Sequence, residues 1–151
     1  MTPKFFMMVG IAGSGKSTVA SKIAASLDGC LVLSSNAIRA ELYGDAAIQD
    51  DARRVFQVME ERTMEALKAG HSVIYDATNI LAWRRQELLA KLPLGVEKIC
   101  LWVNVPVEQA LRNNQMRERH VPEDVIRHQA EQLEKPMKAE GWDEDPIEVL
   151  W

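Results

Sequence analysis

The sequence lacks the features that mark membrane-spanning, disulfide-rich and broadly nucleic-acid-binding proteins. Its 151 residues include two cysteines, and no apolar run approaches the ~20 residues of a membrane-spanning helix. Cys30 and Cys100 lie in apolar segments without metal-ligand spacing, which predicts buried core thiols. The formal net charge of −4 argues against sequence-blind nucleic-acid binding, because such binding depends on a basic surface.

The beginning of the chain does not read as a secretory leader. Residues 1–15 pass from a single lysine through a short apolar stretch into a glycine-rich loop, which suits a strand better than a signal peptide. We therefore expect a cytoplasmic protein that does not associate with a membrane. The length fits a single domain, residues 1–151, with a core of its own.

What the sequence does contain is a regular alternation of short apolar runs and helical patterns. The expected strands are 4–9, 30–33, 72–75, 97–103 and a short 147–150, and the expected helices are 16–27, 36–43, 51–69, 81–92, 107–119 and 122–134. This alternation predicts an α/β fold of three layers, in which helices flank a parallel sheet of about four to five strands. Ligands bind such sheets beyond the carboxyl ends of the strands.

One glycine-rich segment matches a phosphate-binding motif in full. Residues 10–17, GIAGSGKS, fit the pattern G-x-x-x-x-G-K-[ST] between the first expected strand and the first expected helix. Its backbone N–H groups and the helix amino terminus can surround a phosphate chain. The motif predicts a P-loop NTPase fold in which Lys16 reaches the β- and γ-phosphates of ATP and Ser17 ligates Mg²⁺. The expected nucleotide-binding residues are Gly13, Ser14, Gly15, Lys16, Ser17 and Thr18.

The rest of the sequence favours a kinase among the phosphate-loop proteins. It contains no N-K-x-D motif for guanine and is short for a motor core. Residues 112–120, RNNQMRERH, hold three arginines and one histidine against one glutamate. This run predicts a helical, arginine-rich lid, at about residues 112–134, over a phosphate-bearing ligand. The alternative for the same run is a solvated helix face.

Three segments give the sequence a resemblance to the polynucleotide 5′-kinase branch of phosphate-loop kinases. That branch includes stand-alone bacterial kinases and the kinase modules of RNA-repair enzymes. The first segment is GIAGSGKST at 10–18, which is specific to the superfamily. The second is SSNAIRAEL at 34–42 with YDATN at 75–79, and the third is RERHVPEDVI at 117–126 with EGWDE at 140–144. The second and third together narrow the resemblance to the family.

The resemblance implies roles for several residues outside the phosphate loop. Asn36 stands where the family has an aspartate that takes the proton from the acceptor hydroxyl as general base. Arg39 lies on the same helix face and would hold the acceptor's phosphate or orient its hydroxyl. Asp76 and Asn79 would line the acceptor or metal side. Without these roles, Arg39 would be a surface residue, and Asp76 and Asn79 would be turn residues.

A lid arginine, Arg117 or Arg119, would clamp the β- and γ-phosphates as charge develops during transfer. Spacing back from Val121-Pro122 favours Arg117. The family pattern before this arginine is shifted by one residue here, with Met116 interposed, so the choice between the two stays open. The alternative to a clamping role for Arg119 is a solvent-exposed side chain without a function in the site.

Three explanations account for Asn36 at the position of the base. It is an engineered replacement of aspartate, or it is natural in a degenerate kinase or one with a substitute base, or the assigned register is wrong. Asp76 is the best substitute base, followed by Asp45 and Asp50. An amide accepts a hydrogen bond but cannot take a proton, so we expect both substrates to bind and transfer to be slow.

The leading hypothesis is an ATP- and Mg²⁺-dependent kinase that phosphorylates a terminal hydroxyl, namely the 5′-OH of RNA or DNA. A second hypothesis is a small-molecule kinase acting on a nucleoside, a sugar or an antibiotic. It would have a closed acceptor pocket, rather than an open basic channel, beside Arg39. A third is a non-catalytic ATP-binding regulatory module, which would bind ATP without acceptor-dependent turnover even with aspartate at position 36.

Overall fold

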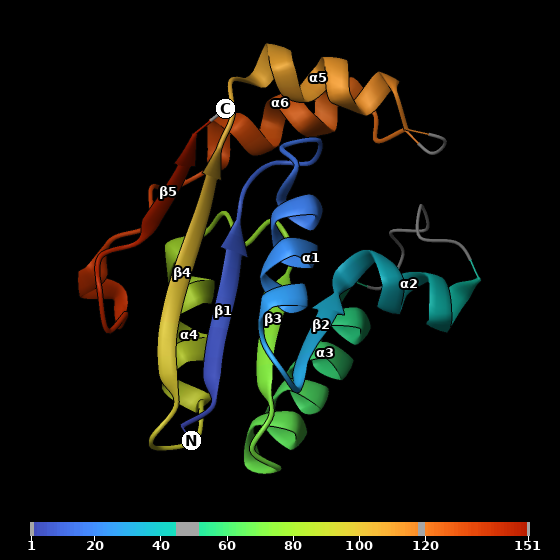
Figure 1. Cartoon of the computed structure of the whole chain (residues 1–151). Coiled ribbons are helices and arrows are strands. Elements are labelled where there is room, and N and C mark those ends of the chain that lie inside the picture. The colour runs from blue at the N-terminus through green and yellow to red at the C-terminus, as the bar shows by residue number, and fades with distance from the viewer. Residues whose placement is uncertain (1, 45–51, 118–119, 151) are drawn as a thin grey trace.

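The computed structural model describes residues 2–44, 52–117 and 120–150 (Figure 1). Three residues named above, Asp45, Asp50 and Arg119, lie outside the described residues. No described helix is both long enough and apolar enough to cross a membrane.

The described strands form one fully parallel sheet, which confirms the α/β prediction. The strands are β1 (Lys4–Val9), β2 (Cys30–Ser34), β3 (Ser72–Asp76), β4 (Glu97–Asn104) and β5 (Ile147–Leu150). Their order across the sheet is β2-β3-β1-β4-β5. The central position of β1 explains its unbroken apolar sequence, because a parallel strand inside a sheet is covered on both faces.

Helices cover both faces of the sheet and the carboxyl ends of its strands (Figure 1). They are α1 (Lys16–Ser26), α2 (Ser35–Tyr43), α3 (Ala52–Lys68), α4 (Ala82–Lys91), α5 (Val107–Gln115) and α6 (Glu123–Gln132), with a short 3₁₀ turn at Lys138–Glu140. In Figure 1, α1 lies on one face, α3 and α4 lie on the other, and α5 and α6 lie beyond the carboxyl ends.

Alternate side chains of β1 enter two separate hydrophobic cores. Phe5 and Met7 pack with the apolar side chains of α3 and α4. Met8 packs on the opposite face with buried residues of α1, α5 and α6, including Ala110 and Ile126. Because the buried residues of α5 and α6 share a core with the sheet, these two helices are anchored over the carboxyl ends of the strands.

Two expectations from the sequence are wrong in detail. The helix expected over 107–119 ends at Gln115, because Asn114 turns the chain: its side chain donates to Val121 O at 2.7 Å and accepts from Val121 N–H at 3.0 Å. Arg117 therefore lies in a bend beyond α5. Cys100 is buried as expected, but Cys30 is only half-buried because β2 is an edge strand.

Candidate active site

The phosphate loop connects β1 to α1 at the carboxyl end of the sheet. Gly10 N–H donates to Thr78 O at 3.0 Å, which ties the loop to the segment that follows β3. Gly13 has φ +81°, and a Cβ added to it would collide with the backbone oxygen of Ala110 in α5. Glycine at position 13 thus allows both the left-handed backbone and the close approach of α5.

Two side chains from the predicted lid hold the phosphate loop directly. Ala12 N–H donates to Gln129 Oε1 of α6 at 2.9 Å, and Asn113 Nδ2 of α5 donates to Gly13 O at 2.8 Å. Sequence reasoning missed both residues. The one signal for Gln129 was its spacing of three from the apolar Ile126, which puts the two on one helix face.

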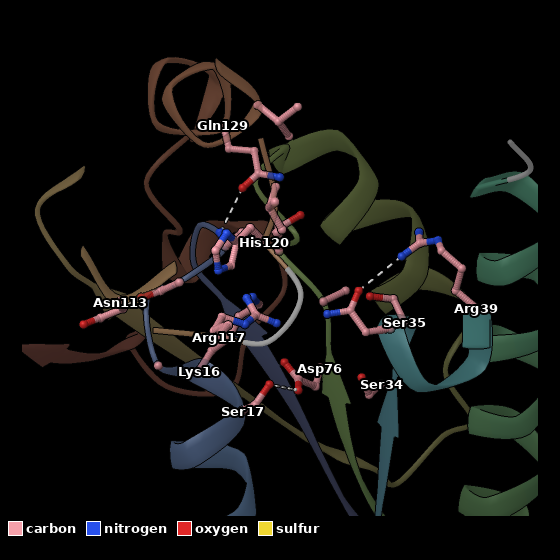
Figure 2. Close-up of a pocket in the computed structure, with 18 of the residues that line it drawn as sticks. Lys16, Ser17, Ser34, Ser35, Arg39, Asp76, Asn113, Arg117, His120 and Gln129 are labelled. Atoms are coloured by element: carbon pink, nitrogen blue, oxygen red, sulfur yellow. Dashed lines mark hydrogen bonds between the residues drawn. The ribbon is translucent and has the colours of Figure 1, made fainter. Parts of the chain in front are cut away.

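Ser17 and Asp76 form a pair of oxygen donors below the loop. Ser17 Oγ donates to Asp76 Oδ2 at 2.8 Å, as the dashed line in Figure 2 marks. Asp76 is only 4% exposed, and its Oδ1 is buried without a hydrogen-bond partner among the described residues. A buried carboxylate oxygen of this kind suits a bound cation, because a buried polar atom without a partner is costly.

The Ser17–Asp76 pair fits Mg²⁺ in chemistry. Hydroxyl and carboxylate oxygens are the hard ligands that Mg²⁺ prefers. Within the described part of the chain, no group of three or more His, Cys, Asp or Glu residues could hold a metal alone. Mg²⁺ commonly completes its shell with substrate phosphates and water, so two protein oxygens beside a phosphate loop are an adequate site.

Lys16 and Arg117 supply positive charge on the phosphate side of the site. Burial lowers the pKa of the Lys16 amine; Asp76 raises this pKa and Arg117 lowers it further. Figure 2 shows Arg117 beside Lys16, with Asp76 between them and the serines that begin α2. The two cations and the loop amides therefore face the region where a phosphate chain would lie.

Arg39 lies on the opposite side of the site and is not a surface residue, since it is only 6% exposed. Its Nη1 donates to Asn36 Oδ1 at 3.2 Å, while its Nε is buried with no partner among the described residues. Burial lowers the pKa of the Arg39 guanidinium, and nearby Tyr43 opposes this shift. The site thus has a buried cation with unused donor capacity.

A cavity of about 810 Å³ joins the phosphate side to the Arg39 side. Sequence-predicted residues that line it are Gly13, Gly15, Lys16, Ser17, Thr18, Asn36, Arg39, Asp76 and Arg117. Phe56, His120 and Val125 also line it and were not expected to.

Of the predicted residues that the structure describes, two do not line the cavity. Ser14 has its hydroxyl buried without a partner among the described residues. Asn79 instead shapes the loop after β3, where its Nδ2 donates to Met8 O at 2.7 Å and its backbone has φ +48°. This is the turn role that was its alternative.

Comparison with known proteins places the sequence in a family. The sequence profile of the AAA domain family matches residues 5–136. A search of curated proteins found no significant match. Among solved structures, a chain of the Pnkp1/Rnl/Hen1 RNA repair complex is similar with a TM-score of 0.77 and 24% identity, over 87% of this chain. The protein spans only 44% of that longer chain.

Two small-molecule kinases have a similar fold. A sugar kinase from Janibacter sp. is 21% identical with a TM-score of 0.70, over 99% of this chain and 84% of that one. The APS kinase CysC of Mycobacterium tuberculosis, solved with AMPPNP and APS, is 17% identical with a TM-score of 0.67, over 99% and 88% of the two chains. At these identities the likeness establishes the fold and leaves the acceptor undetermined. With a family profile that covers most of its length, the chain belongs to the AAA domain family and has the fold of a phosphate-loop kinase.

Proposed function

We propose that the protein is an ATP- and Mg²⁺-dependent kinase that transfers the γ-phosphoryl group of ATP to the 5′-OH of RNA or DNA. The observation that carries the acceptor choice is the buried Arg39, whose Nε has no partner among the described residues. A buried guanidinium requires an anion, and the acceptor is the ligand that reaches this side of the cavity. A nucleic acid end carries a phosphate one sugar away from its 5′-OH, whereas a neutral sugar carries none.

On the ATP side, the loop amides and Lys16 bind the phosphate chain, and Arg117 adds charge beside the transferred group. Ser17 and Asp76 would hold Mg²⁺, which neutralises negative charge on the β- and γ-phosphates when bound. Phosphoryl transfer depends mainly on such positioning and charge stabilisation.

The apolar part of the cavity supports a nucleoside end over a sugar. Phe56 of α3 and Pro122 and Val125 at the start of α6 line the cavity together with the polar groups. A planar base can pack on such side chains, while a sugar with many hydroxyls would leave hydrogen bonds unmade.

Asn36 makes slow transfer the expected behaviour. Its amide oxygen accepts from Arg39 and cannot take the hydroxyl proton. General-base help is typically worth ~10²–10⁴ in rate. Asp76 is the one carboxylate among the described residues lining the cavity, and it is engaged by Ser17. A carboxylate that holds Mg²⁺ is a poor base, so Asp76 is better assigned to the metal.

A small-molecule kinase is the second candidate, because a cavity of about 810 Å³ is in the size range of small-ligand sites. Its acceptor would need an anionic group for Arg39. A non-catalytic ATP-binding module is the third candidate, and Asn36 is the observation that favours it.

The test is transfer of ³²P from [γ-³²P]ATP with Mg²⁺ to 5′-OH RNA and DNA oligonucleotides, using the protein and its Asn36→Asp variant side by side. We expect the variant to label the oligonucleotide on the order of 10²-fold faster than the parent. A Lys16→Ala, Asn36→Asp double variant is the matched inactive control. If neither protein labels the oligonucleotide although both bind ATP, the 5′-kinase proposal is overturned. Labelling of an anionic small acceptor would then support the second candidate, and no labelling the third.

A further inference from the structure

An exposed aromatic residue with an arginine over its ring lies at the start of α4, five residues after the cavity-lining Thr78. Trp83 is 56% exposed in the first turn of α4, and Arg84 Cζ lies 5.2 Å from the centre of its ring. Trp83 follows shortly after the loop from β3, whose Thr78 lines the cavity. Its ring offers a flat aromatic face on which a ligand can pack.

A second arginine belongs to the same end of the neighbouring helix. Helices α3 and α4 lie on the same face of the sheet and run in the same direction (Figure 1). Glu60 and Lys91 join them at 3.2 Å. Arg53 precedes Glu60 by seven positions, and Arg84 precedes Lys91 by seven. Seven positions are about two helical turns, so both arginines lie toward the amino-terminal end of the helix pair.

This group, which we name the Trp83 platform (Trp83, Arg84 and Arg53), is positively charged on a protein of net charge −4. Among the described residues, neither Arg53 nor Arg84 has a carboxylate partner. Glu87, one turn after Trp83, is paired with Lys91 at 3.5 Å. Arg84 therefore lies over an exposed indole, and Arg53 adds a second positive charge at the same end of the helix pair.

One member of the platform is close in sequence to the acceptor side of the cavity. Ala52 and Phe56, on the first turns of α3, line the cavity. Arg53 directly follows Ala52 in α3, so this arginine lies one residue from the cavity lining.

We infer that the Trp83 platform binds the single-stranded nucleic acid beyond its terminal nucleotide. This inference rests on the proposed 5′-OH acceptor and names its class: an extended single strand rather than a mononucleotide. Aromatic faces stack on any base and arginines contact the backbone phosphates, which is the usual way to bind single strands without reading sequence. The platform would supply affinity for the strand, while Arg39 and the cavity hold its end.

Binding of a single strand to the platform is measured without catalysis. A 3′-fluorescein-labelled 12-nucleotide strand with a 5′-OH is titrated with protein and followed by anisotropy. We expect Trp83→Ala to weaken binding about tenfold and Trp83→Phe to restore most of it. The affinity falls as salt is added, and we expect Arg84→Ala to make the slope of log affinity against log salt shallower by about 0.7, as the loss of one phosphate contact does.

Matched controls remove similar groups from the far end of the same helices. Lys68→Ala removes a positive charge from the last turn of α3, and Leu94→Ala removes a fully exposed apolar side chain after α4. Both are expected to bind the strand like the parent. Equal losses in the controls and the platform variants would overturn the inference.

Acceptor length separates failure of the platform from failure of the proposed function. In the Asn36→Asp background, we expect Trp83→Ala to raise KM for a 12-nucleotide acceptor about tenfold and to leave a dinucleotide acceptor unchanged. If both lengths are phosphorylated and Trp83→Ala affects neither, the platform is refuted while the kinase proposal stands. If no length is phosphorylated although ATP binds, the kinase proposal fails. The anisotropy titration then decides the platform by itself: it stands if the platform variants bind the strand more weakly than their controls, and it is refuted if they do not.

Discussion

The side-chain oxygen of Gln129 accepts a hydrogen bond from the backbone N–H of Ala12 at 2.9 Å, which joins α6 to the phosphate loop (Figure 2). The side chain of Asn113 makes a second link, from α5 to the oxygen of Gly13 at 2.8 Å. Both side chains also line the cavity. The helical part of the predicted lid is therefore fastened to the loop that it was expected to cover.

We expect Gln129→Leu to weaken ATP binding about fivefold, because the loop loses a hydrogen bond worth ~1 kcal/mol that fixes its shape. Gln129→Glu keeps the accepting oxygen but places a negative charge near the phosphates, so its loss should be larger and salt-dependent. Calorimetric titration with Mg·ATP measures both. Gln132→Leu, on an exposed position of the same helix, is the control. Equal affinities for the parent and the two Gln129 variants would show that the link does not shape the loop.

Asp76→Asn should separate metal binding from packing. The amide retains the shape and still accepts from Ser17, but the site loses its negative charge. We expect the Mg²⁺ concentration needed for tight ATP binding to rise on the order of tenfold. The measurement is ATP affinity across a Mg²⁺ series, with metal-free ATP affinity as the internal control. An unchanged Mg²⁺ requirement would remove Asp76 from the metal site.

Local chemistry explains which parts of this site could be predicted. The phosphate loop was evident because its function needs glycines, a lysine and a hydroxyl at fixed spacing within one segment. The family resemblance implied an acceptor-side role for Arg39, and its spacing of three positions from Asn36 put both on one helix face. Asp76 ends a strand next to β1, and parallel strands bring such positions to one edge of a sheet.

The residues that were missed depend on tertiary packing. Gln129 binds backbone 117 positions away, and Asn113 binds backbone 100 positions away, and neither pairing leaves a local pattern. The end of α5 was misplaced for a similar reason. Residues after Gln115 are compatible with a helix, but the two hydrogen bonds between the Asn114 side chain and the Val121 backbone end it.

Lys16 gives a pH dependence with a definite sign. Burial lowers the pKa of its amine, so the amine loses its proton at a pH below the ordinary range of lysine. Because the charged form attracts the phosphates, ATP affinity should fall as the pH rises through this lowered pKa, and binding there should take up a proton. Calorimetry in buffers of different ionisation enthalpy measures the uptake. Lys16→Arg stays charged and should show a flat profile. Constant affinity of the parent up to the ordinary lysine pKa would contradict the shift.

A buried ion pair supports the site from behind. Arg85 and Glu140 are joined at 2.8 Å, with side chains 0% and 7% exposed. Arg85 also donates to Asn79 O at 2.7 Å and to Glu134 O at 2.9 Å, and Trp142 Nε1 donates to Glu140 at 3.2 Å. The pair thus links α4, the loop after β3 and the segment before β5.

We expect Arg85→Ala to lower the free energy of unfolding by roughly 3–5 kcal/mol, because it leaves Glu140 buried without its cation. Arg62→Ala breaks an exposed ion pair in which Arg62 Nη2 and Glu41 Oε1 are 2.6 Å apart. This change should lower the free energy of unfolding by only ~0–1 kcal/mol. Urea denaturation of the two variants compares a buried and an exposed ion pair in one fold. Since Arg85 also holds the loop that carries Thr78, the variant should bind ATP more weakly even where it is fully folded. Equal midpoints for the two variants would mean that Arg85 is dispensable to the core.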